Sequence, residues 1–104
     1  MQLIEALEHS QPGLLTRVTS AIHKHQLNQR TEQNYLHWIT RFVLFHDQKS
    51  VEMLEQDDRQ LFLSYLRDRI QVSRARLNQA RQALTFFYED VLNKDETATT
   101  HAAA

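Results

Sequence analysis

The stretch from Arg30 to His46 constrains the fold most, because its large apolar side chains recur at helical spacing. Steps of three and four residues place such side chains on one face of an α-helix. The members of this apolar stripe are Tyr35, Trp38, Ile39, Phe42 and Phe45. Only one glycine and one proline occur among 104 residues, so the tight turns that join β-strands are scarce. Both features together predict an all-α fold.

The same periodicity recurs in three other segments. We expect helices over about residues 13–25, 56–70 and 74–93, in addition to the helix that ends near residue 46. Short connections between them favour a small antiparallel bundle of four main helices, of the kind called SAM-like. Residues 1–12 are predicted to form a short N-terminal helix or arm, residues 13–93 the core domain, and residues 94–104 a linker or tail.

The helix starts and the core can also be predicted. Asn28 and Ser73 have the side chains that accept hydrogen bonds from the free amides of a helix start, so each is expected to be an N-cap. The connector over residues 47–55 is expected to tuck its apolar side chains under the bundle. The residues predicted to face inward from the connector and the third helix are Val51, Met53, Leu54, Phe62, Leu63, Leu66 and Ile70.

Charge is segregated along the chain, although the net charge is only −1. Residues 67–81 hold five arginines and one aspartate, whereas residues 47–58 hold five acidic side chains and one lysine. A polyanion responds to the local potential of a surface and not to the total charge. The basic blocks are therefore compatible with a nucleic-acid partner.

Two helix faces carry polar side chains suited to DNA. Guanidinium, amide and imidazole groups hold phosphates and read base edges. On the second helix such groups share a strip at steps of four, three and four residues, and on the fourth helix they lie at and after its start. The candidate DNA-binding residues are Arg30, Asn34, His37 and Arg41 on the former, and Ser73, Arg74, Arg76, Asn78, Arg81 and Gln82 on the latter.

Three segments resemble a known family. They read RTEQNYLHWITRFVLFHD from Arg30, FLSYL over 62–66 and NQARQALTFFYEDVL over 78–92. Together they are similar to the N-terminal core-binding domain of tyrosine recombinases, and most of all to integron integrases and related phage-type integrases. The resemblance covers roughly residues 13–93.

The resemblance implies a fold and a function. Core-binding domains of this family are SAM-like bundles that sit on one side of duplex DNA, while a separate C-terminal domain supplies the catalytic tyrosine. Two helices, here those of Arg30–His46 and of the segment after Ser73, face the major groove. The first helix helps neighbouring subunits assemble into a synaptic tetramer. Family members commonly carry a small hydroxyl residue where Arg76 stands and an apolar residue where Arg81 stands, so base contacts cannot be copied across.

Catalysis, metal binding and membrane insertion find little support in the sequence. Tyr35, Tyr65 and Tyr88 occupy apolar or intermediate helix positions, which indicates packing and not a nucleophile. Cysteine is absent, and the six histidines show no convergent ligand spacing, so neither a metal nor a cofactor is expected. No apolar run is long enough to cross a bilayer. We therefore expect a non-enzymatic, cytoplasmic DNA-binding domain.

A different class of function remains open at this point. Phe86 is expected to project away from the core face of the last helix, where it would contact the catalytic domain or a partner subunit. Phe86 and the acidic segment 47–58 could also belong to a helical protein–protein interaction module without nucleic-acid binding.

Overall fold

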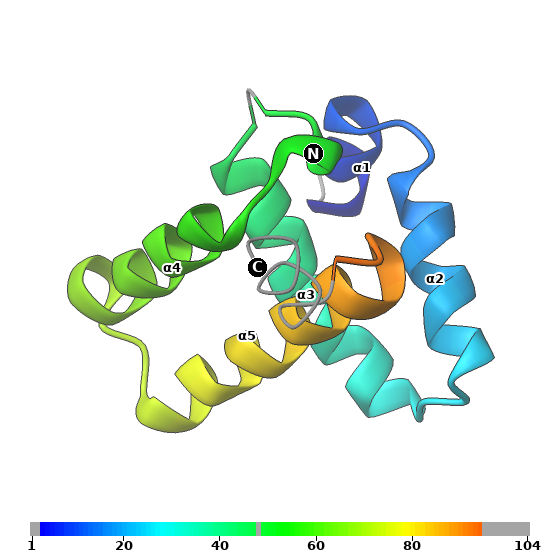
Figure 1. Ribbon diagram of the computed structural model, residues 1–104. Coiled ribbons are helices and arrows are strands. Elements are labelled where there is room, and N and C mark those ends of the chain that lie inside the picture. The colour runs from blue at the N-terminus through cyan, green and yellow to red at the C-terminus, as the bar shows by residue number, and fades with distance from the viewer. Residues whose placement is uncertain (1–2, 48, 95–104) are drawn as a thin grey trace, which may run out of the picture.

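Five α-helices dominate the computed structural model, which describes residues 3–47 and 49–94 (Figure 1). They are α1 (Leu3–Ser10), α2 (Leu14–Lys24), α3 (Gln29–Phe45), α4 (Gln56–Tyr65) and α5 (Arg74–Phe86). A 3₁₀ turn, η1 (Val51–Met53), precedes α4, and two π-helical segments, η2 (Leu66–Ile70) and η3 (Phe87–Val91), continue α4 and α5. No strand occurs in the described residues, so the all-α prediction is confirmed. Residues 95–104 of the predicted tail lie outside this description.

The predicted caps form at the starts of α3 and α5. The Asn28 side chain accepts a hydrogen bond from the Thr31 amide at 2.8 Å, and the Ser73 hydroxyl accepts one from the Arg76 amide at 3.2 Å. Each bond satisfies one of the amides that a helix start leaves free. Both helices therefore begin where the sequence predicts.

Helix α3 runs through the middle of the bundle and contacts each of the other α-helices (Figure 1). Its Phe42 is fully buried, and the ring lies 5.5 Å from that of Phe62 on α4. The rings of Phe87 and Tyr88 lie 6.1 and 6.0 Å from it on the other side. These distances fall within the range of favourable aromatic pairs, so one side chain joins three segments of the chain.

The N-terminal helix belongs to the same core. Leu7 is fully buried, and α1 packs against both α2 and α3. The Ser10 hydroxyl donates a hydrogen bond to the Asp47 carboxylate at 2.9 Å, which ties the end of α1 to the end of α3.

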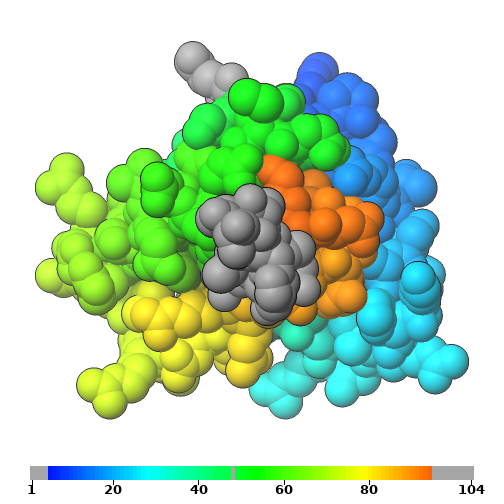
Figure 2. All heavy atoms as spheres, viewed as in Figure 1, coloured from blue at the N-terminus to red at the C-terminus, as the bar shows by residue number. Residues whose placement is uncertain are grey.

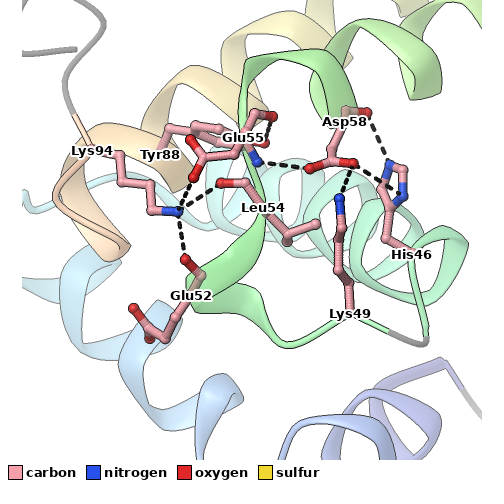
Figure 3. A network of polar contacts seen from close by, with 8 residues as sticks. All are labelled: His46, Lys49, Glu52, Leu54, Glu55, Asp58, Tyr88 and Lys94. Atoms are coloured by element: carbon pink, nitrogen blue, oxygen red, sulfur yellow. Dashed lines mark hydrogen bonds and ion pairs between the residues drawn. The ribbon is translucent and has the colours of Figure 1, made fainter.

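A polar network fixes the connector between α3 and α4 (Figure 3). The Tyr88 hydroxyl donates to the carbonyl oxygen of Glu55 at 2.6 Å. The Lys94 ammonium donates to the carbonyl oxygens of Glu52 and Leu54, both at 2.7 Å. Tyr88 and Lys94 therefore hold the connector in place through hydrogen bonds to three of its carbonyl groups.

The connector buries only part of its predicted apolar set. Val51 and Leu54 are buried as expected, whereas Met53 is 61% exposed and that prediction was wrong. A 3₁₀ turn has three residues per turn, so Val51 and Leu54 share one side and Met53 points away.

Asp58 anchors the start of α4 to the end of α3. Its carboxylate accepts hydrogen bonds from the Lys49 ammonium and the Glu55 amide, both at 2.8 Å (Figure 3). Burial alone would raise the pKa of Asp58, but these bonds outweigh it and the pKa is lowered. A His46 ring nitrogen lies 2.9 Å from the Asp58 carbonyl oxygen, and this histidine is partly buried just after the end of α3.

The prediction of an exposed Phe86 was wrong. The side chain is only 7% exposed, and its ring lies 5.0 Å from that of Tyr35 and 5.8 Å from that of His25. The end of α2 and the first turns of α3 both close over this part of α5. A residue opposite the main apolar stripe is buried here because the helix is covered on more than one side.

Two side chains predicted to face inward lie at the surface instead. Phe45 is 36% exposed at the last position of α3, and Ile70 is 51% exposed at the end of η2. A π-helical segment is wider than an α-helix, so η2 breaks the spacing of three and four residues on which the prediction for Ile70 rests. Gln71 then ends the helix in the left-handed region, with φ of 62°.

We predict that Tyr88→Phe destabilises the fold by about 1 kcal/mol, because it removes the hydrogen bond that the Tyr88 hydroxyl donates to the Glu55 carbonyl oxygen. For a domain of this size, that loss lowers Tm by about 4–8 °C in a thermal melt. The matched control is Tyr35→Phe, whose hydroxyl takes no part in the network of Figure 3. A Tyr88→Phe protein as stable as the wild type would show that the network does not hold the connector.

Candidate nucleic-acid interface

A hollow of about 520 Å³ opens between α3, the second half of α4, η2 and the start of α5. Two of the predicted DNA-binding residues, Arg41 on α3 and Arg76 on α5, lie on its wall. The remaining lining is apolar or aromatic: Trp38, Leu44, Phe45, Phe62, Tyr65, Leu66, Ile70 and Val72. No carboxylate belongs to this lining within the part of the chain that the structure describes.

Arg76 is held in place from two sides. Its guanidinium carbon lies 5.5 Å from the centre of the Trp38 ring, a distance at which the cation is attracted to the ring face. Its backbone amide is bonded to the Ser73 hydroxyl. The charge is thereby directed from the first turn of α5 toward α3.

His37 lies close enough to both arginines for its protonation to respond to them. Partial burial lowers the pKa of this imidazole, and the positive charges of Arg41 and Arg76 lower it further. The Nε2 atom is buried and has no hydrogen-bond partner among the described residues. The structure therefore brings three predicted site residues together from two helices.

Helices α3 and α5 both begin at the lower edge of the view in Figure 1, and the surface there is formed by the same segments in Figure 2. Arg30 and Arg74, the second residue of α3 and the first of α5, are exposed. A helix start carries partial positive charge and free amides, so it attracts anions. In Figure 1 the start of α3 lies at the lower right and that of α5 at the lower left, and only the first turn of α5 also lines the hollow, through Arg76.

The remaining candidates occupy other parts of α3 and α5. Arg81 and Gln82 line a shallow hollow with Tyr35 and Asp90, and Arg81 also lines one beside α4. Neither residue lines the hollow of Arg41 and Arg76. Asn34 is half-buried on α3, and Asn78 is exposed on α5.

Sequence reasoning missed the apolar part of the site. Helical spacing predicts that Phe45 and Ile70 lie in the core, and it predicts no role for Val72. The available signal is the position of Ile70, which is the last residue before a polar connector and follows Arg67 and Arg69 closely. An apolar residue in so basic a segment is a candidate for contact with a partner.

The structure shows how the side chains considered for catalysis and metal binding are placed. Burial is the main cause that raises the pKa of the Tyr88 phenol, followed by the charge of Asp58, and the hydroxyl donates to a backbone carbonyl. Tyr88 therefore packs as predicted. Within residues 3–47 and 49–94, no three histidine or acidic side chains come together as metal ligands would. None of the described helices is long and apolar enough to cross a membrane.

These features define a small all-α domain with a basic, partly apolar surface formed by two helices. Residues 14–97 match the family model of the phage integrase N-terminal SAM-like domain. The match covers most of the chain, so the chain belongs to this family, and the resemblance inferred from its motifs is confirmed.

Two curated proteins are similar over the same domain. Each is named "Integrase/recombinase", one from Escherichia coli and one from Pseudomonas aeruginosa. Both are 41% identical to this chain over 66 residues, which is 64% of the chain and 20% of the relative. The matched region therefore spans about a fifth of the length of these relatives.

We predict that His37→Gln reduces the loss of stability at acidic pH. Because the folded state lowers the pKa of His37, the unfolded state binds a proton more readily. The wild type therefore loses stability as the pH falls below 6.5, the ordinary value for histidine, and the variant loses less. Urea unfolding at several values between pH 8 and about pH 5 measures this difference. Parallel curves for the two proteins would contradict it.

Proposed function

We propose that this chain is the DNA-binding N-terminal domain of a phage-type tyrosine recombinase. In this role it holds and orients a duplex recombination site for DNA integration, while a separate domain performs strand cleavage. The observation that carries the proposal is the convergence of Arg41 and Arg76 on one hollow, in a member of the phage integrase SAM-like family.

The electrostatics of the hollow support a polyanionic ligand. Its lining includes two guanidinium groups and no carboxylate within the described residues. Phosphates that approach the hollow near Arg76 also meet the amides and positive dipole of the start of α5. Affinity then comes mainly from phosphate neutralisation, with base edges read by the arginines.

The same proposal covers partners and location. The DNA-binding domain would act with the catalytic domain and with other recombinase subunits in a synaptic assembly, inside the bacterial cytoplasm. The support is the family of the chain and the name of its two similar proteins, "Integrase/recombinase".

The rival function, a protein-interaction module, has lost support. Phe86 is buried against Tyr35, so it offers no exposed anchor. Part of the acidic segment 47–58 is already engaged within the chain, because Asp58 binds Lys49 and Glu55 pairs with Lys94 at 3.6 Å.

We predict that Arg41→Ala and Arg76→Ala each weaken binding to duplex DNA and each lower the salt dependence. Every phosphate contact removed reduces the slope of log K against log salt concentration by about 0.9. Fluorescence anisotropy with a labelled 20-base-pair duplex, at several salt concentrations, measures both quantities.

The matched control is Lys24→Ala, which removes one exposed positive charge from α2, on the side of the bundle formed with η3. Its DNA affinity and salt slope should stay close to those of the wild type, and circular dichroism should show unchanged helix content in all three variants. If Lys24→Ala lost as much DNA affinity as the arginine variants, the surface of Arg41 and Arg76 would not be the DNA-binding surface.

A further inference from the structure

Exposed apolar side chains gather at the proposed DNA face. Five large apolar residues are exposed among those described, and three of them line the hollow between the two arginines. These three are Phe45, Tyr65 at 37% exposure and Ile70 at 51% exposure. The Phe45 and Tyr65 rings lie 4.8 Å apart and form one wall. A surface that binds only phosphates would not require exposed apolar side chains.

The chemistry of duplex DNA limits what can cover this patch. Phosphates and most base edges are polar, and they would gain nothing from replacing water at an isoleucine or a phenyl ring. The major groove presents one apolar group, the C5-methyl of thymine, and 5-methylcytosine carries a methyl at the same position. A hollow with an apolar lining and cations beside it is complementary to such a methyl next to the phosphates of the groove.

We infer that this hollow recognises the C5-methyl group of a pyrimidine in the major groove, with Ile70 as the specificity-determining residue. The inference rests on the proposed function, because it needs α3 and α5 to face duplex DNA. Among the three exposed apolar side chains of the lining, Ile70 is the most exposed. Arg41 and Arg76 hold the flanking phosphates or base edges.

A cation–π contact holds Arg76 against one wall of the hollow. Arg76 is drawn to the Trp38 ring, 5.5 Å away, and Trp38 itself is 2% exposed. The guanidinium therefore has a fixed place on the wall, and the apolar centre stays available to a ligand.

Two pairs of 20-base-pair duplexes test the inference on the wild-type chain. The first pair compares a DNA duplex of alternating dA and dT with one of alternating dA and deoxyuridine. The second pair compares alternating dG and 5-methyl-dC with alternating dG and dC. Within each pair only the methyl group differs. Burial of one methyl group is expected to favour the methylated duplex by about fourfold, which corresponds to about 0.8 kcal/mol. The same preference should appear in both pairs, measured by fluorescence anisotropy at low salt.

A variant then assigns the preference to the hollow. Ile70→Asn should abolish the methyl preference and leave the salt slope unchanged, whereas Leu61→Asn, at another exposed apolar position outside the lining, should retain both. Salt-dependent binding with equal affinity for methylated and unmethylated duplexes would overturn the inference and leave the proposed function standing, with another occupant covering the hollow. Failure to bind any duplex at low salt would overturn both.

Discussion

The packing of α3 against α4, α5 and η3 around Phe42 is the contact on which the rest of the structure depends. The Phe42 ring meets Phe62 of α4 and the Phe87–Tyr88 pair at the end of α5, so three segments distant in sequence share one centre. Aromatic side chains bury large areas, and a small domain gains much of its stability from few such residues. The network of Tyr88 and Lys94 then closes the connector over this centre (Figure 3).

The same packing determines the surface proposed to bind DNA. Because α3 and α5 are fixed against each other, a residue from each, Arg41 and Arg76, reaches one hollow. The first turn of α5 also brings a helix start to this hollow. In the account proposed here, phosphate binding and base reading follow from this arrangement without any moving part, since rigid elements hold the charges in place before the DNA arrives.

Much of the fold could be predicted from the sequence, because apolar residues recur every three or four positions in a long amphipathic helix. The stripe of α3 and the caps at Asn28 and Ser73 gave helix limits close to those observed. The errors occur where a second structural rule overrides that spacing: a 3₁₀ turn exposes Met53, a π-helical segment exposes Ile70, and coverage from a second side buries Phe86. Within the proposed site, helical geometry predicted which polar residues share a strip on each helix. It could not predict how the two helices cross, which brings Arg76 near His37 and Arg41. Arg81 does not line the hollow of Arg41 and Arg76. Such contacts depend on how the helices pack together, and the spacing of residues along one helix does not determine this.

The central claim is that one surface, formed by α3, η2 and the start of α5, meets duplex DNA. Amide chemical-shift mapping of the isotope-labelled chain, titrated with a 20-base-pair duplex at low salt, tests it most directly. The account predicts that the perturbed amides cluster around Arg41, Ile70 and Arg76 and extend to the starts of both helices. Perturbations confined to α2 and the connector at Val51–Met53, with this surface unchanged, would contradict it.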